Sequence, residues 1–178
     1  MLKAADMHDP QLLPFVAIGL FAGVRVYELM QLDWKHVDLI EGSIDLPASI
    51  TKRERRRSVP ITPTLRAWLE HYISKHGIGN GFVLPFRTYN TLRRHLRELF
   101  KQAKVRWQQN AARHSYASYW LAEHNDLTKL ALYMGHVGGL EVLHMHYHRA
   151  VKKADAAKFW AIAPKSEASK VVSIEAAG

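Results

Sequence analysis

Three residues that can act on a phosphate follow one another in the carboxy-terminal half of the chain: Arg113, His136 and Tyr147. Asn110, Arg113 and His114 are spaced i, i+3 and i+4, so a helix would place all three on one side. Cations gathered around a tyrosine indicate nucleophilic attack on a phosphodiester.

Cleavage of a phosphodiester without a metal has several chemical requirements. It needs a nucleophile and positive groups that neutralise the negative charge on the non-bridging oxygens. It also needs a proton for the leaving oxygen and an acceptor for the nucleophile's own proton. Arg113 and the distant Arg25 suit the second task, because each guanidinium donates two parallel hydrogen bonds and stays charged. A lysine or a histidine suits proton transfer. Free tyrosine has a pKa of about 10, so nearby cations are needed to favour the phenolate of Tyr147.

The composition is that of a basic globular protein. The chain has 178 residues, is 48% hydrophobic and carries 25 Lys and Arg against 16 Asp and Glu, a formal charge of +9. This excess suits a polyanionic partner, most simply nucleic acid. The absence of cysteine excludes disulfides, thiolate zinc sites and cysteine nucleophiles. No apolar run is long enough to cross a bilayer and the amino terminus lacks a signal-peptide hydrophobic region, so we expect an intracellular, cytoplasmic protein without a membrane partner.

The elements that position these residues read mainly as helices. Apolar spacing predicts a helix that Asp9-Pro10 opens and Gly23 stops, and then a second helix over about 26–32. Arg25 falls in the turn between the two helices, where its side chain can leave the core. Glu28 lies three residues further on and can hold Arg25.

The period then changes from helical to alternating. Residues 37–46 alternate around Glu41-Gly42, which predicts a hairpin, and the basic stretch 52–58 leads into a third short strand. Helices are expected from Thr62-Pro63, over about 90–104, through the Arg113 stretch, and over about 127–133, 140–148 and 151–162. The predicted fold class is therefore mainly α with a small three-stranded antiparallel β-sheet (α+β).

The order of these motifs resembles the catalytic domain of the tyrosine recombinase (phage integrase) family, from about Leu12 to Pro164. The resemblance covers a first arginine box, a lysine in a hairpin turn, a second arginine box, a Leu-Gly-His element and a nucleophile segment. In this sequence these are Gly23–Leu29, Lys52, Ala112–Ser118, Met134–His136 and His146–Tyr147.

The resemblance implies a role for each position and a tyrosine recombinase catalytic-domain fold. Arg25 and Arg113 would clamp the scissile phosphate, and His136 would hydrogen-bond it. Lys52 would be the general acid to the leaving 5′ oxygen, and Tyr147 would form a 3′-phosphotyrosine. The reaction implied is site-specific breaking and rejoining of DNA strands, with no metal and no cofactor.

The family pattern His-x-x-Arg appears here with Asn110 in place of the histidine. The Asn110 amide can hydrogen-bond a phosphate but cannot transfer a proton near neutral pH, so we place it in the site and expect weaker base assistance. The expected partner is double-stranded DNA. We expect the chain to be a monomer in isolation and to form a homo-oligomer (a tetramer) on DNA, where it is associated with the nucleoid. The residues expected to contact DNA phosphates, with an affinity that falls steeply with salt, are Arg53, Arg55, Arg56, Arg57, Arg93, Arg94 and Arg97.

The expected domain organisation is a single catalytic domain with a tail. Residues 1–164 form the domain, and residues 165–178 are polar and small, which predicts a disordered or partner-docking segment. An amino-terminal DNA-clamping domain, usual in full-length recombinases of this kind, is not among the residues of this chain.

Two other functions stay open on the sequence. One is a DNA-binding module that keeps the fold but does not cut, which Asn110 favours. The other is a type IB topoisomerase-like enzyme that relaxes DNA without site specificity. Each motif also has an ordinary structural reading when taken singly, such as Arg25 paired with Glu28 at the surface or the basic stretch as an exposed hairpin tip. The prediction depends on their joint occurrence in the family's order.

A histidine cluster near the nucleophile suggests metal binding at first sight. No carboxylate follows His144, His146 and His148 at ligand spacing, and in a helix only His144 and His148 share a face. We therefore expect no metal site there.

Overall fold

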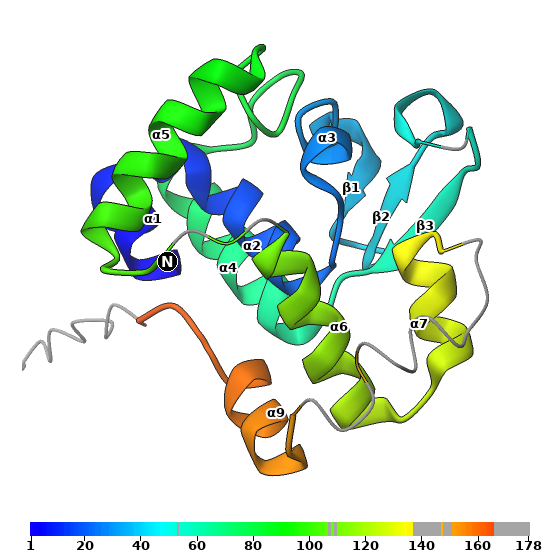
Figure 1. Cartoon of the computed structure of the whole chain (residues 1–178). Coiled ribbons are helices and arrows are strands. Elements are labelled where there is room, and N and C mark those ends of the chain that lie inside the picture. Colours follow the sequence, from blue (N-terminus) through cyan, green and yellow to red (C-terminus); the bar gives the residue numbers. More distant parts are fainter. Residues whose placement is uncertain (53, 107, 109, 137–146, 148–150, 166–178) are drawn as a thin grey trace, which may run out of the picture.

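The computed structural model describes residues 1–52, 54–106, 108, 110–136, 147 and 151–165. Within them the chain is mainly helical with one three-stranded antiparallel sheet, which confirms the predicted fold class (Figure 1). The α-helices are α1 (Leu2–His8), α2 (Leu13–Phe21), α3 (Val26–Leu29), α4 (Pro63–His76), α5 (Tyr89–Gln102), α6 (Ala111–His124), α7 (Leu127–Met134) and α9 (Lys153–Trp160). Short 3-10 turns occur at Pro10–Leu12, Trp34–His36 and Ala48–Ile50, and the strands are β1 (Val37–Asp38), β2 (Ser43–Leu46) and β3 (Arg57–Pro60).

The predicted elements are present with some shifted boundaries. The first long helix begins at Leu13 and not at Asp9-Pro10, because Pro10 opens a 3-10 turn and the Asp9 carboxylate contacts His95 at 2.7 Å without capping a helix. The helix predicted over about 26–32 is a single turn, Val26–Leu29. The expected helix over 140–148, apart from Tyr147, and the tail 166–178 lie outside the described residues. In the part of the chain that is described, no helix combines the length and apolar character of a membrane span.

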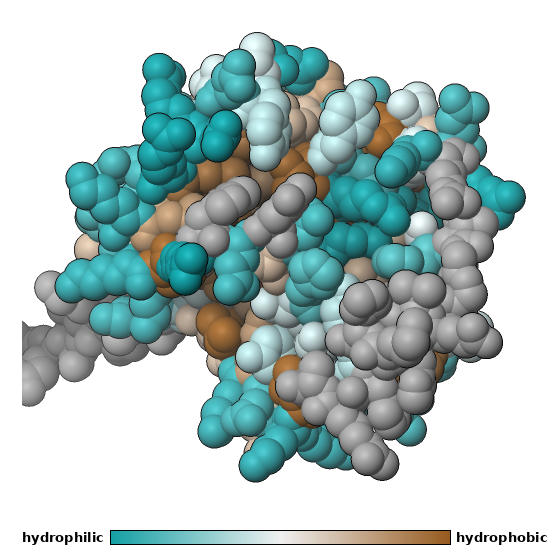
Figure 2. Space-filling model, viewed as in Figure 1, coloured by the Kyte–Doolittle hydropathy of each residue, from teal (hydrophilic) through white to brown (hydrophobic). Residues whose placement is uncertain are grey.

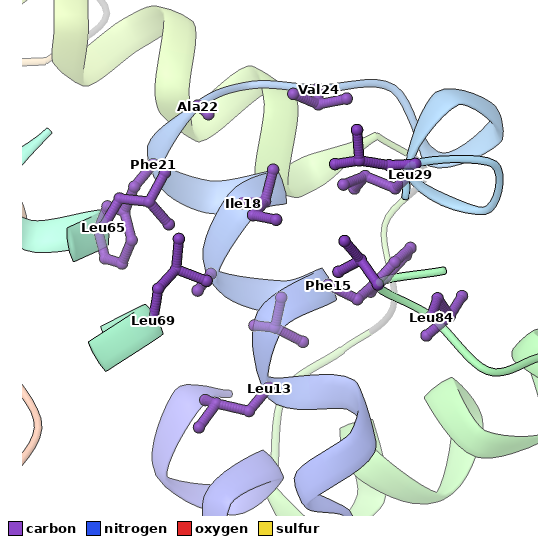
Figure 3. Packing of buried hydrophobic residues seen from close by; sticks show 14 of the residues in the cluster. Leu13, Phe15, Ile18, Phe21, Ala22, Val24, Leu29, Leu65, Leu69 and Leu84 are labelled. Carbon is purple, nitrogen blue, oxygen red and sulfur yellow. The ribbon is translucent and has the colours of Figure 1, made fainter. Parts of the chain in front are cut away.

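Helix α2 is the centre of the core. All of its residues except Leu20 are buried, so the helix must be covered on every side. Helices α1, α4 and α6 pack against it. Figure 3 shows Leu65 and Leu69 of α4 on one side of α2, and Leu29 and Leu84 on another. This central position fixes the turn after α2, from which Arg25 projects.

The sheet has the order β1-β2-β3 and brings the basic stretch back toward the helices. Val37 pairs with Ile44, and Ile44 pairs with Val59, in antiparallel register. Alternate residues of β2 and β3 are buried, as expected for a sheet with one face on the core. Helix α7 packs against β3 (Figure 1), so the buried face of β3 meets the end of that helix.

The end of α2 meets α6 at a residue that has no side chain. Gly23 directly follows Ala22, the C-cap residue of α2, and has a φ of +63°. This confirms the prediction that the helix stops at Gly23. A Cβ atom at this position would lie 2.3 Å from Cδ1 of Tyr116. The Tyr116 ring therefore lies directly over the glycine, and the segment that carries Arg25 runs beside the helix that carries Arg113.

Substitution of Gly23 is expected to loosen this junction. Gly23→Ala should lower the free energy of unfolding by about 2–5 kcal/mol, because left-handed strain of about 1–2 kcal/mol adds to overpacking of about 1–3 kcal/mol. Gly77→Ala is the matched control, since Gly77 has a φ of +74° but a Cβ atom added there would meet no other atom within 4 Å. Only backbone strain applies there, about 1–3 kcal/mol for a residue with a φ of +74° and a ψ of 172°. Urea unfolding of both variants measures the difference, and equal losses would contradict the steric role of Tyr116.

Candidate active site

Side chains from distant parts of the sequence line one cavity of about 680 Å³. Arg25 comes from the turn before α3, Arg113 from α6, His136 from the residue after the α7 cap, and Tyr147 from the segment beyond. Asn110 also lines this cavity. The structure thus brings together five of the six residues that the sequence predicts to be catalytic.

Arg25 is held by the first turn of α3. Its backbone amide and its Nη1 each donate a hydrogen bond to the Glu28 carboxylate, both at 3.1 Å. This confirms the prediction that Glu28 holds Arg25. Nη2 of Arg25 donates to the carbonyl oxygen of Gly135 at 3.2 Å, and the side chain stays 29% exposed. The guanidinium is therefore oriented and still open to the cavity.

Arg113 reaches across the junction between α2 and α6. Its Nη1 donates to the carbonyl of Gly23 and its Nη2 to the carbonyl of Met134. Burial, followed by the positive charge of Arg25, lowers the pKa of Arg113 to about 9, although Glu28 opposes this effect. A partly buried cation that pairs with no carboxylate among the described residues favours the binding of an anion nearby.

Arg57 differs from the other arginines of the basic stretch. It is 8% exposed, its Nη1 and Nη2 donate to the Glu28 carboxylate at 2.9 and 2.5 Å, and its Nε donates to the carbonyl of Tyr133 at 3.0 Å. The prediction that Arg57 contacts a DNA phosphate is therefore corrected, because a buried guanidinium paired with a carboxylate does not face a ligand. The alternation of β3 was the available signal, since Arg57 shares a face with the buried Val59.

Glu28 is the shared partner of two of these arginines. It is 1% exposed. Burial alone would raise the pKa of Glu28, but the hydrogen bonds and charge of Arg57, and then those of Arg25, outweigh it and leave that pKa below its ordinary value. Glu28 is therefore a carboxylate at neutral pH.

The carboxy-terminal end of α7 gathers all three guanidiniums. The carbonyls of Tyr133, Met134 and Gly135 accept hydrogen bonds from Arg57, Arg113 and Arg25, respectively. The last carbonyls of a helix carry partial negative charge and lack partners within the helix, so cations are favoured there. Gly135 ends the helix with a φ of +59°, and the His136 amide donates to the Ala131 carbonyl at 2.9 Å. The backbone of His136 thus closes the helix while its ring lines the cavity.

The two remaining groups of the cavity respond to burial in opposite ways. Burial, and then the charges of Arg113 and Arg25, lower the pKa of His136 to about 4, so its imidazole is neutral at pH 7 and keeps one N–H to donate. Burial raises the pKa of Tyr147, and Arg113 offsets part of the rise. Tyr147 is 8% exposed and packs in a small apolar cluster with residues of α6 and α7.

His114 contacts the phenol of Tyr147. Its Nδ1 lies 2.6 Å from the Tyr147 Oη, within hydrogen-bond distance. The sequence placed His114 beside Arg113 on the predicted helix, but it gave no reason to assign His114 a role. The spacing alone could not show which residue the imidazole meets.

Asn110 does not belong to the helix that follows it. It is exposed and has a left-handed φ of +58°, and α6 begins at Ala111. The three residues still lie on one side as predicted, since all three line the cavity, but Asn110 caps the helix and is not part of it. The Asn110 carbonyl accepts the His114 amide at 2.9 Å.

Lys52 lies in a neighbouring cavity of about 450 Å³, which Arg25, Tyr27 and Glu28 also line. Arg25 and Tyr27 line both cavities, so the two spaces meet at these residues. Lys52 itself is exposed on the connection between β2 and β3.

The other basic residues predicted to touch DNA are on the surface. Arg55 and Arg56 are exposed in the β2–β3 connection, and Arg93, Arg94 and Arg97 are exposed on α5. Arg56 also pairs with Asp45 at 3.0 Å. Figure 2 shows hydrophilic residues gathered over α5, and Figure 1 shows α5 and the β2–β3 connection on either side of α3. Arg53 lies outside the described residues.

The described ranges contain no group of three or more His, Cys, Asp or Glu side chains that could hold a metal ion. The histidines at 144, 146 and 148 lie outside those ranges.

Comparison with known proteins finds similar proteins both in sequence and in fold. The model of the phage integrase family matches residues 1–153. The tyrosine recombinase XerC of Serratia marcescens is 26% identical over 148 residues, which are 76% of this chain and 48% of the relative, and XerC of Yersinia pestis is 24% identical over the same length. The chain therefore spans about half the length of these curated relatives.

Solved structures share the fold. The XerA recombinase matches with a TM-score of 0.68 and 21% identity, over 89% of this chain and 60% of that one. The catalytic domain of bacteriophage HP1 integrase matches with a TM-score of 0.64 and 20% identity, over 88% of this chain and 86% of the domain. The XerH site-specific recombinase bound to its difH substrate matches with a TM-score of 0.62 and 21% identity, over 90% of this chain and 51% of that one.

Loss of the Glu28 carboxylate is expected to destabilise the site from within. Glu28→Gln leaves the buried Arg57 guanidinium without an anion and should lower the free energy of unfolding by about 3–5 kcal/mol. Arg56→Met is the matched control, because it removes the ion pair of Arg56 with Asp45, in which the arginine side chain is 73% exposed. That loss should be at most about 1 kcal/mol. Urea unfolding at neutral pH compares the two, and similar small losses would contradict the structural role of the Glu28–Arg57 pair.

Proposed function

The chain belongs to the phage integrase family, and we propose that it breaks and rejoins DNA strands at specific sites through a covalent 3′-phosphotyrosine on Tyr147. One observation carries the proposal: Arg25, Arg113, His136 and Tyr147, which are far apart in the sequence, line a single cavity. Two guanidiniums next to a phenol meet the main electrostatic requirement of attack on a phosphodiester.

In the proposed reaction, Arg25 and Arg113 clamp the scissile phosphate. Each exchanges a backbone carbonyl at the end of α7 for a non-bridging oxygen and can donate to it in parallel hydrogen bonds. His136, neutral at pH 7, donates its N–H to the same phosphate. Because these donors are already oriented by Glu28 and the α7 carbonyls, little reorganisation accompanies phosphate binding.

The positions of Tyr147 and Lys52 support their proposed roles. The Tyr147 oxygen attacks phosphorus as the bond from phosphorus to the 5′ oxygen breaks, and the two oxygens lie roughly in line in such a displacement. Tyr147 lines one cavity and Lys52 lines the neighbouring one, with Arg25 between them in both linings. A phosphate held by Arg25 would therefore have the phenol on one side and the ammonium group, which protonates the leaving 5′ oxygen, on another.

We also propose that the substrate is double-stranded DNA and that residues 1–164 are the catalytic unit. The surface arginines Arg55, Arg56, Arg93, Arg94 and Arg97 would contact phosphates on either side of the scissile one, with Arg53 as a further expected contact and Arg57 excluded by burial. The XerH structure of the same fold is bound to its difH substrate, which supports this partner. Assembly into a homo-oligomer on DNA is part of the same proposal.

A DNA-binding module that does not cut is the second candidate. Asn110 favours it, because an amide occupies the position of the family histidine and cannot transfer a proton. This candidate predicts DNA binding without a covalent product.

The decisive experiment traps the covalent intermediate. The chain is incubated with a pool of nicked duplexes of randomised sequence, in which cleavage near the nick releases a short fragment and prevents rejoining. We expect a covalent protein–DNA product on a denaturing gel, and sequencing of the trapped DNA then gives the preferred site. Tyr147→Phe should form none, because it lacks the attacking oxygen, whereas Tyr72→Phe, which alters a ring stacked on Trp34, should form it normally.

The other outcomes separate the alternatives. Binding without any adduct in the unmodified chain would identify a non-cleaving module. Relaxation of a supercoiled plasmid with no sequence preference in the trapped DNA would indicate a type IB topoisomerase-like enzyme. An adduct formed by Tyr147→Phe would falsify the assignment of the nucleophile.

DNA affinity is expected to depend steeply on salt through the surface arginines. Arg93→Gln and Arg97→Gln should each make the slope of log affinity against log salt shallower by about 0.9, the effect of losing one phosphate contact. Lys158→Gln is the control, since this exposed residue lies on α9 and pairs with Asp155. Fluorescence anisotropy over a salt series measures the slopes. An unchanged slope in both arginine variants would remove α5 from the proposed DNA interface.

A further inference from the structure

The phenol of Tyr147 has a partner that the reaction described above does not use. Nδ1 of His114 lies 2.6 Å from Tyr147 Oη. A general base acts within about 2.6–3.2 Å of the atom whose proton it takes. His114 follows Arg113 directly on α6, so one turn of one helix supplies both a phosphate clamp and a contact to the nucleophile.

The phenol needs such a partner in this environment. Tyr147 is 8% exposed, burial raises the pKa of its phenol, and Arg113 offsets only part of that rise. A proton must therefore leave toward a specific acceptor as the oxygen attacks. The Asn110 amide cannot accept it, and Lys52 lies in the neighbouring cavity.

We propose that His114 is the catalytic base for Tyr147, an assignment that rests on the proposed function. The unprotonated Nδ1 of His114 accepts the phenol proton while Tyr147 Oη bonds to phosphorus. The bond from phosphorus to the 5′ oxygen breaks, and that oxygen takes a proton from Lys52. In rejoining, the 5′ hydroxyl attacks phosphorus and returns its proton to Lys52, and the His114 imidazolium returns its proton to Oη. Every proton is thereby restored at the end of the cycle.

The surroundings of His114 make the assignment testable by pH. Among the described residues, the other ionisable groups that line the same cavity are Arg25, Tyr27, Arg87, Tyr89, Arg113, His136 and Tyr147. By chemical type only the imidazoles change charge between about pH 5 and 8. The pKa of His136 is lowered to about 4, which is below that range. Because His144, His146 and His148 lie outside the described residues, the pH dependence is assigned to His114 by comparing variants: a pH-dependent step that the unmodified chain shows and His114→Ala lacks marks His114 as the group that takes the proton.

The test uses single-turnover cleavage of the DNA site recovered with the trapping experiment. His114→Ala should slow cleavage by about 10²–10⁴-fold and remove one pH-dependent step from the rate profile of the unmodified chain. Imidazole added to the buffer should restore part of the rate, because it can occupy the space left by the ring. His124→Ala, which removes an exposed histidine at the far end of the same helix, should cleave at the normal rate with the normal pH profile.

A second substrate separates the base from the general acid. With sulfur in place of the bridging 5′ oxygen, the leaving group needs no proton, so Lys52→Ala should regain cleavage while His114→Ala should remain slow. If the sulfur-containing DNA restored the cleavage rates of Lys52→Ala and His114→Ala to the same extent, the proposal would be overturned. A His114→Ala rate within about threefold of normal would also overturn it, as would a slow rate with an unchanged pH profile, which would indicate a structural role alone. These results all require a normal adduct from the unmodified chain, whose absence would instead refute the proposed function.

Discussion

Repulsion among like charges is the constraint that shapes the centre of this protein. Arg25, Arg57 and Arg113 converge within the fold, and one carboxylate, Glu28, is shared between two of them. The carbonyls at the end of α7 and the carbonyl of Gly23 accept further hydrogen bonds from the three guanidiniums. The arrangement leaves a net positive charge facing a cavity, which is the condition under which an anion binds without the side chains having to move far.

The supporting parts of the fold serve this convergence. The fully buried α2 fixes the turn that carries Arg25, and the glycine after α2 lets α6 approach closely enough for Arg113 to reach the same space. The strand β3 brings Arg57 from the hairpin to the end of α7. Residues with no direct chemical role thus decide whether the reactive ones meet.

Most of the helices and strands could be predicted from the sequence, because the spacing of apolar residues indicates the type of each element. The hairpin, the helix stop at Gly23 and the support of Arg25 by Glu28 were all readable locally. The start of α2 was not, since the contact of Asp9 with His95 depends on a helix that lies far along the chain. The burial of Arg57 was indicated by the alternation of β3, but its basic neighbours favoured an exposed reading, and the contact of His114 with Tyr147 depends on how two distant segments pack. Pairings of this kind are set by tertiary packing, which single-residue patterns do not encode.

The hydrogen bonds from Arg25 and Arg113 to the end of α7 also bear on reversibility. An incoming phosphate must compete with these backbone oxygens, so part of its attraction is cancelled by the contacts it displaces. In the proposed reaction, this competition would weaken the binding of the phosphate before cleavage and after rejoining alike, while the extra negative charge of the transition state would still gain the full benefit of both cations. Arginines that are occupied by backbone carbonyls in the resting state would therefore keep the proposed strand exchange from being trapped by tight binding of either its substrate or its product.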